Sequence, residues 1–342
     1  MSNTLVGNSN EELPEGAPSR GARKLSFSGV NLPPYVGALG ALILLCIVLS
    51  IVSPSFLTVA NIFNIGQQSA ILAVIAIGGT AVIIVGGIDL SVGSILALAG
   101  AVVGVFHIGL GWDVWSASFL GLVVGAAAGA VNGILIVLGR LPAFIATLAM
   151  MSVARGLSLV VLDGRPLSGY PESFRALTTH YVAGWLPTSV VVAAVCLLIA
   201  GFYFRFAPSG RSLFAMGANL EVSRLSGVPT GRLMIGVYTV AGILAAVGGI
   251  MMTSRLGSAQ PTAGTGIELD VIAAVVIGGA SLSGGYGSIV GTAVGVLMIG
   301  VLRNGLNLLN VSSFWQQVVI GVVIALAVLV EQFRQRRVLS AP

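Results

Sequence analysis

Residues 86–94 read Gly-Gly-Ile-Asp-Leu-Ser-Val-Gly-Ser and divide a long apolar stretch into two runs, 67–87 and 90–110. The acid in this string is Asp89, and neither run contains a charged residue. A carboxylate facing hydrocarbon costs about 2.5–3.5 kcal/mol, so Asp89 must face protein, water or a membrane surface. The glycines around it weaken regular helix and allow the backbone to turn. We therefore expect a break between two membrane spans at this string.

The composition is that of a membrane protein. Of 342 residues, 56% are hydrophobic and 8% are charged, far from the roughly 25% charge of a soluble domain. The net charge of +5 does not indicate nucleic-acid binding, because the arginines are scattered at the ends of apolar runs. Cys46 and Cys196 lie far apart in apolar runs, which predicts no metal site and no disulfide framework.

Ten apolar runs approach the roughly 20 residues that a spanning helix needs. They are 35–53, 67–87, 90–110, 115–138, 142–162, 187–204, 232–252, 268–282, 286–304 and 314–331. The sequence therefore predicts an all-α polytopic membrane protein with about ten transmembrane helices. The count of ten depends on how the short segments near 86–94 and 268–286 are divided between neighbouring spans.

Arginine and lysine prefer the cytoplasmic side, which sets the expected orientation. With the N-terminus inside and ten spans, eleven of these residues are cytoplasmic and four are outside. Both termini are then cytoplasmic. We expect a disordered cytoplasmic tail at 1–29, a transmembrane domain at 30–332 and a second cytoplasmic tail at 333–342.

Short motifs recur at a spacing of about half the chain. Val85-Gly86-Gly87-Ile88 recurs as Val247-Gly248-Gly249-Ile250, and Gly121, Gly125 and Gly129 recur as Gly287, Gly291 and Gly295. Five predicted spans separate the copies, and an odd number turns the second copy upside down. We therefore predict two inverted five-helix repeats, at about 35–165 and 187–332, with a substrate path between them. The alternative is chance recurrence of two common residue types.

The same glycines have a simpler interpretation as well. Spaced by four residues, they line one face of a helix and allow a second helix to approach closely. Helix packing is favoured over a direct role in substrate binding.

The connection at 205–231 is the longest charged cytoplasmic one. Its centre, Ala218 to Ser226, predicts a short surface helix with Leu220 and Leu225 as apolar contacts. Such a helix suits docking into a groove of another protein. From the residues alone, an ordinary charged loop that only anchors topology is equally consistent with the sequence.

The chain lacks a nucleotide-binding P-loop, because its single lysine, Lys24, follows an arginine in the tail. It also lacks the several intramembrane acids and histidines of a proton relay. We expect no catalytic residues, no cofactor in this chain and an energy source outside it.

Several long strings resemble those of the permease subunit of ribose-type ABC importers. They are Gly86 to Ser94, the segment from Gly210-Arg211 to Leu225-Ser226-Gly227, Gly278-Gly279-Ala280-Ser281-Leu282-Ser283-Gly284-Gly285, Ser258-Ala259-Gln260-Pro261, Asn304-Gly305-Leu306-Asn307 and Val311 to Gln317. The similarity covers about 35–332. It implies a bacterial inner-membrane pore of two permease copies, identical or different, surrounded by lipid.

The resemblance also implies partners. A periplasmic sugar-binding protein delivers a monosaccharide, and a separate cytoplasmic ATPase uses ATP to drive its import. The connection at 205–231 then contacts the ATPase. Its coupling residues are Arg211, Asn219, Glu221, Arg224 and Gly227. Many family members carry a second acid where Val222 stands here, which weakens the expected charge contribution.

A sugar path needs donors and acceptors matched to hydroxyl groups. The candidates are Gln67, Gln68, Ser91, Ser94, Asn132, Asn304, Asn307, Gln316 and Gln317. Each has an alternative role in hydrogen bonding between helices, which is favoured for any single residue.

Asp89 has three interpretations: it caps the helix that starts near Leu90, it pairs with Arg140 or a loop arginine, or it binds substrate. Capping, with a place in the gate region, is favoured. The rival function is a secondary carrier or facilitator that works without an ATPase. The sequence does not choose among ribose, xylose, arabinose, galactose and related sugars.

Overall fold

The computed structural model describes residue 33 and residues 35–339, with side chains through residue 329. Its helices are α1 (Tyr35–Val52), α2 (Val59–Ile84), α3 (Val92–Gly104), the π-helix η1 (Val105–Gly109), α4 (Val114–Val137), α5 (Ala143–Val161), α6 (Glu172–Thr179), α7 (Thr188–Phe206), α8 (Pro208–Ala218), α9 (Leu220–Leu225), α10 (Thr230–Leu256), α11 (Ile267–Ile277), α12 (Ile289–Leu308) and α13 (Ser313–Leu339). Four strands of two residues each, β1 (Leu167–Ser168), β2 (Tyr181–Val182), β3 (Leu186–Pro187) and β4 (Ser258–Ala259), complete the regular structure of the described part. The predicted all-α membrane fold is confirmed.

Each of the ten predicted runs falls on a helix, and eight helices of the described residues are long and apolar enough to cross a membrane. The other two runs correspond to α11, which has 11 residues, and to α13, whose apolar part is Ser313–Leu329. The count of ten spans therefore stays a prediction. Helix α13 continues to Leu339, past the predicted end of the last span at 331. The predicted tail at 1–29 lies outside the described residues.

Helix α2 is the centre of the bundle. Most of its residues are buried, and α10, α7, α11 and α12 pack around it. A helix that is apolar on every side is covered either by other helices or by lipid, and α2 is covered by helices. Helix α1 is the opposite case, because only 6% of its apolar window is buried and it packs mainly on α12.

The glycine stripes lie where helix backbones meet. On α4, Gly125 and Gly129 face the backbone of α10 around Gly242 and Tyr238, and Gly121 faces the carbonyl group of Ala99 on α3. A Cβ on Gly125 would lie 2.6 Å from the carbonyl oxygen of Gly242. A larger residue there would push the two helices apart.

The second stripe belongs to α12 and its N-terminal connection. Gly291 and Gly295 face the backbone of Gly278 and Ala274, at the end of α11 and within it, and Gly287 lies against the side chain of Ile84. Both stripes therefore lie at close helix contacts.

A similar order of elements occurs twice. A long helix, a non-helical connection, a short helix, a glycine-rich helix and a further helix appear as α2 to α5 and again as α10 to α13. The contacts cross over, because α4 packs on α10 and α12 packs on α2. The motif match made from the sequence differs from this order, because Val85 follows the last residue of α2, whereas Val247 to Ile250 lie within α10.

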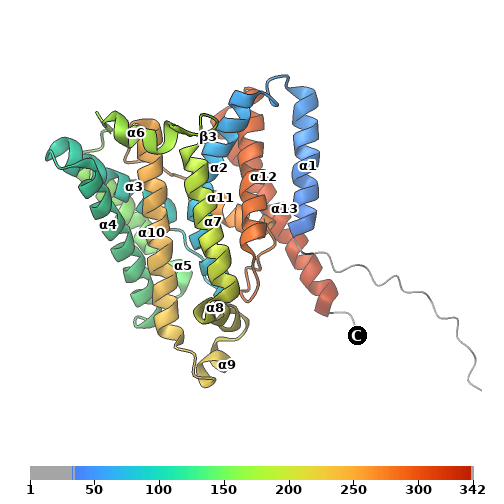
Figure 1. The fold of residues 1–342 in the computed structure, drawn as a ribbon. Helices are drawn as coiled ribbons and strands as arrows, with labels where there is room; N and C mark the ends of the chain where they lie inside the picture. Colours follow the sequence, from blue (N-terminus) through green and yellow to red (C-terminus); the bar gives the residue numbers. More distant parts are fainter. Residues whose placement is uncertain (1–32, 34, 340–342) are drawn as a thin grey trace, which may run out of the picture. The chain divides into compact units, whose positions relative to one another are not determined.

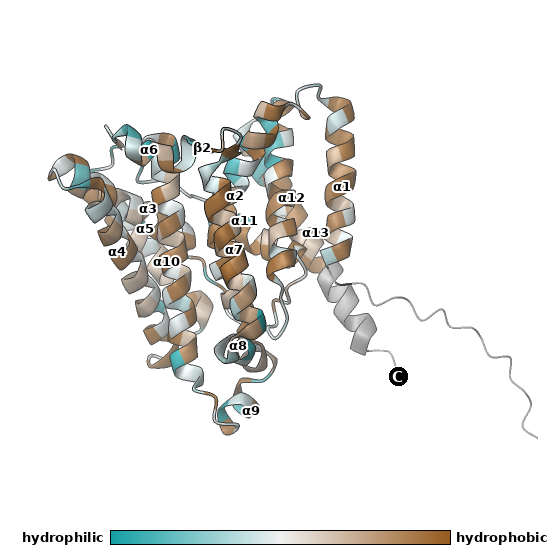
Figure 2. Cartoon of the chain, viewed as in Figure 1, coloured by the Kyte–Doolittle hydropathy of each residue, from teal (hydrophilic) through white to brown (hydrophobic). Residues whose placement is uncertain are grey.

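The two ends of the bundle carry different short elements. Figure 1 shows α8 and α9 at one end and α6 with β3 at the other. There β1 pairs with β4 and β2 pairs with β3, both antiparallel. Brown, apolar residues cover much of the long helices in Figure 2, while teal residues are prominent on α6, α8 and α9. This distribution suits a bundle whose middle lies in hydrocarbon and whose ends lie in water.

Candidate functional site

The acid Asp89 lies in a buried turn just before α3. Its carboxylate accepts hydrogen bonds from the backbone N–H of Ser91, at 2.8 Å, and from the Ser91 hydroxyl, at 2.6 Å. The side chain of Asn132, on α4, donates to that same hydroxyl at 2.9 Å. Among the described side chains, Asp89 forms no ion pair with Arg140 or any other arginine. The arrangement is a short side-chain turn at a helix start, tied to α4.

Three strings that resemble family motifs meet at one junction, although they are distant in sequence. The backbone N–H of Gly285 donates to the carbonyl oxygen of Ile84, the last residue of α2, at 2.8 Å. Gly217, near the end of α8, packs against that oxygen so closely that a Cβ would overlap it. A Cβ on Gly284 would lie 2.9 Å from the carbonyl oxygen of Gly217 and 3.0 Å from the backbone of Gly86. We call this contact between residues 84–86, 217–218 and 283–285 the helix junction.

The connection predicted to carry a docking helix forms α8 and α9. Asn219 caps α9, because its side-chain oxygen accepts the backbone N–H of Val222 at 3.0 Å. Glu221 and Arg224 form an ion pair of 2.9 Å on the surface. Gly227 follows the helix with a φ of 82°, a conformation that favours glycine. Arg211 lies on α8, which joins this helix to the junction.

Helix α9 exposes apolar side chains. Leu220 is 51% exposed, Val222 57% and Leu225 78%. Glu221 and Arg224 beside them are also exposed, at about two thirds of their side-chain area. A capped helix with exposed apolar and charged groups side by side has the character of a docking surface.

The polar residues predicted to line a path fall into separate groups. Ser91, Ser94 and Asn132 are buried around the Asp89 turn. Asn304 is also buried and exchanges two hydrogen bonds with Asn61 on α2, at 3.0 and 2.7 Å.

The others lie elsewhere. Gln316 donates to Asn307 at 2.7 Å, Gln317 is exposed on α13, and Gln67 and Gln68 are half-buried on α2. The structure does not bring the nine residues together into one lining.

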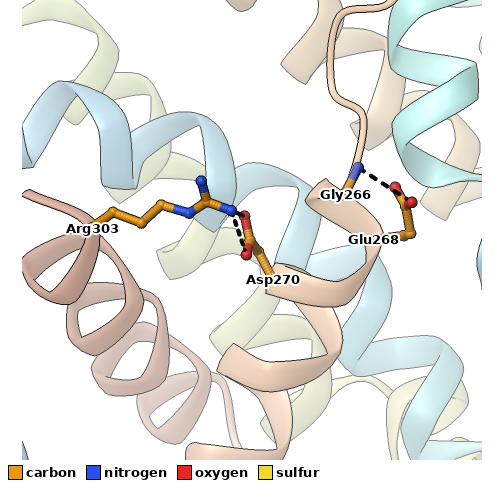
Figure 3. Close-up of polar contacts among 4 residues, drawn as sticks. All are labelled: Gly266, Glu268, Asp270 and Arg303. Atoms are coloured by element: carbon orange, nitrogen blue, oxygen red, sulfur yellow. Dashed lines mark hydrogen bonds and ion pairs between the residues drawn. The ribbon is translucent and has the colours of Figure 1, made fainter. Parts of the chain in front are cut away.

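A polar cavity of about 220 Å³ lies between α2, α10, α11, α12 and the connection that precedes α11. Its polar lining residues are Gln68, Ser69, Arg255, Thr265, Asp270 and Arg303. Arg303 donates from α12 to both carboxylate oxygens of Asp270 on α11, at 2.8 and 2.6 Å (Figure 3). Glu268 points away from this pair and accepts the backbone N–H of Gly266 at 3.3 Å (Figure 3).

This ion pair was not predicted from the sequence. Asp270 and Arg303 lie inside predicted spans 268–282 and 286–304, so the argument that singled out Asp89 applies equally to them. Asp270 is 5% exposed, and the Arg303 side chain keeps about a third of its area exposed.

Comparison with known proteins gives a family for the chain. Residues 61–328 match the family model for the branched-chain amino acid transport system / permease component. The ribose import permease protein RbsC of Escherichia coli K12 is 46% identical over 304 residues, covering 86% of this chain and 92% of the relative. That of Bacillus subtilis 168 is 47% identical over 314 residues, covering 91% and 96%.

A further relative is the L-arabinose transport system permease protein AraH of Escherichia coli K12. It is 37% identical over 318 residues, covering 92% of this chain and 96% of the relative. No solved structure was found to match. The family model covers the helix junction and the cavity, and the chain belongs to the family of branched-chain amino acid transport system / permease components.

Proposed function

We propose that this chain is the membrane-spanning permease subunit of an ATP-binding-cassette importer for a monosaccharide, in the bacterial inner membrane. The observation that carries the proposal is helix α9, a capped and exposed helix joined through α8 to the helix junction. Similarity to ribose and L-arabinose permeases over most of the chain supports the choice of substrate class.

The proposed partner at α9 is a separate cytoplasmic ATPase. Leu220, Val222 and Leu225 supply the apolar contact, and Glu221 and Arg224 supply charges that fix its register. A groove that accepts one helix face would bury these side chains on assembly. The chain itself carries no P-loop sequence, so ATP is hydrolysed by the partner.

Movement of α9 is transmitted through the helix junction. Because Gly217 contacts the end of α2 with no side chain between, a shift of α8 moves Ile84 and Gly285 with it. The Asp89 turn follows α2 directly and begins α3, so its position depends on the same contact. Helices α2 and α3 are therefore the elements that a conformational change of the ATPase would displace.

The proposed orientation puts α8, α9 and both termini in the cytoplasm. The arginines of α8 and α9 lie at the end of the bundle opposite α6, whose own arginine is Arg175. The excess of basic residues in the connections on the α9 side supports this orientation.

A second permease copy and a periplasmic sugar-binding protein complete the proposed complex. The crossed packing of α4 on α10 and α12 on α2 supports two inverted halves that enclose a path. Asn307 and Gln317 remain predicted path residues, whereas Gln67 does not line the polar cavity. Asn304 is better explained by its paired hydrogen bonds to Asn61.

Uptake of labelled sugars tests this function. A strain lacking the gene is compared with the same strain carrying it, for D-ribose, L-arabinose, D-xylose and D-galactose. Gene-dependent uptake of at least one sugar supports the proposal. Expression of the full complex without gene-dependent uptake of any of them would overturn the sugar assignment.

The alternative is a carrier that works without an ATPase. Removing the ATPase gene distinguishes the two. Uptake is lost if the chain is an importer subunit and persists if it is a carrier.

A further inference from the structure

We propose that the polar cavity between α2, α10, α11 and α12 is the entry site for the transported sugar. The inference rests on the proposed function and adds a site to it. The cavity lies where α10 ends, at Leu256, and α11 begins, at Ile267, with a non-helical connection between them. Interrupted helices of this kind form substrate sites in membrane transporters, because their free backbone groups and end charges face the interior.

Its position suits entry from outside. Arg303 is close to the C-terminal end of α12, Asp270 is in the first turn of α11 and Arg255 is in the last turn of α10. The C-terminal ends of α10 and α12 are on the α6 side of the bundle, opposite α8 and α9. In the proposed orientation a sugar released outside the membrane meets this cavity before it meets the helix junction.

The lining offers both donors and acceptors for hydroxyl groups. The carboxylate of Asp270 accepts, the guanidinium groups of Arg255 and Arg303 donate, and the Gln68 amide does both. Asn64 links two of these groups, because its side-chain oxygen accepts from Gln68 at 3.3 Å and from Arg255 at 3.2 Å. A sugar hydroxyl can give and take a hydrogen bond at once, so a neutral polyhydroxylated ligand fits this mixture.

Two polar atoms at the cavity are unpartnered among the described residues. The Nε–H of Arg303 and the hydroxyl of Ser69 are buried and have no hydrogen-bond partner. A buried polar group without a partner costs about 1–3 kcal/mol. Small rotations of these side chains toward a bound hydroxyl would remove that cost, which gives the ligand affinity.

Charge argues for a neutral ligand over the other class that the family name suggests, a zwitterionic amino acid. Such a ligand needs a free negative group for its ammonium. The carboxylate of Asp270 is already neutralised by Arg303, with both oxygens bonded. Arg255 adds a positive charge to the cavity, and the C-terminal end of α10 stabilises that charge.

Adjacent glutamines provide a matched test. Gln68 lines the cavity, while Gln67 does not. Each is replaced by cysteine in a background carrying Cys46→Ala and Cys196→Ala, and the full importer is assembled in membranes. A membrane-impermeant methanethiosulfonate reagent is added from outside, with D-ribose, L-arabinose or L-leucine as the protecting ligand.

The transported sugar, at ten times its apparent Kd, is expected to slow modification of Gln68→Cys about tenfold and to leave Gln67→Cys unchanged. Thr265→Cys, across the cavity, repeats the measurement if Gln68→Cys does not assemble. Protection by L-leucine alone, equal effects at positions 67 and 68, or no protection in an importer that takes up sugar would overturn the entry site. Wild-type protein that takes up no sugar would instead contradict the proposed function.

Discussion

The backbone N–H of Gly285 donates a hydrogen bond of 2.8 Å to the carbonyl oxygen of Ile84, which ends the central helix α2. Gly217 of α8 packs on the same oxygen. The end of α2, α8 and the connection at 283–285 therefore meet at this carbonyl group, and Leu213 and Met216 of α8 are buried in the core beside it. We propose that this contact transmits movement from the ATPase to the membrane helices.

The junction predicts a strong effect of a single methyl group. Gly217→Ala places a Cβ on the Ile84 carbonyl, and such overpacking typically costs about 1–3 kcal/mol. We expect a lower thermal unfolding midpoint in detergent and loss of most ATP-driven uptake. Gly201→Ala is the control, because a Cβ at that helical position of α7 meets no atom within 4 Å. Equal midpoints and uptake for the two variants would contradict the junction.

The ion pair on α9 is predicted to serve docking and not folding. Both side chains are mostly exposed, so reversing Glu221 to lysine should change the unfolding midpoint little. ATP-driven uptake should fall, because a charge facing the ATPase has changed sign. The double variant Glu221→Lys with Arg224→Glu restores the pair within α9 but keeps both charges reversed. Full recovery of uptake in that variant would show that the pair acts only within the helix.

Asp89 is predicted to act through its hydrogen bonds and not through its charge. In Asp89→Asn the side-chain oxygen still accepts the N–H of Ser91, whereas Asp89→Leu leaves that N–H without its side-chain partner. We expect Asn to keep most uptake and Leu to impair assembly. Uptake assays with matched expression levels test this, and an equal loss in both variants would refute a role for these hydrogen bonds.

The pair Asp270 and Arg303 predicts non-additive stability changes. In Arg303→Met a buried carboxylate loses its cation. Breaking a fully buried ion pair this way lowers the free energy of unfolding by about 3–5 kcal/mol. Because solvent reaches Arg303, we expect a smaller loss of about 2–3 kcal/mol. The double variant Asp270→Leu with Arg303→Met removes both charges and should unfold at a higher temperature than the single. Additive changes in midpoint would argue against a coupled pair.

Sequence patterns predicted the helices because long apolar runs and glycine stripes are local signals. For Asp89 the sequence predicted a cap on the helix that follows it, whereas its carboxylate accepts the N–H and the hydroxyl of Ser91, which precedes α3. Gly227 was predicted to end its helix, because glycine favours the positive φ that often follows a helix, and its φ is 82°.

Long-range contacts could not be predicted in this way. Ile84, Gly217 and Gly285 belong to separate segments, and only the packing of α2 brings them together. The cavity has the same origin, because its walls come from four helices. Asn304 was assigned to a path on polarity alone, and its position opposite Asn61 gave it a partner that the sequence did not reveal.

The most direct test of the account is uptake by reconstituted vesicles. The permease is inserted into liposomes with its ATPase inside, and the sugar-binding protein loaded with labelled D-ribose, or with the sugar identified by the uptake panel, is added outside. Sugar accumulation is expected to require internal ATP, the ATPase and the binding protein together, and to fall in the Gly217→Ala variant. Equal accumulation without ATP or without the ATPase would contradict this expectation.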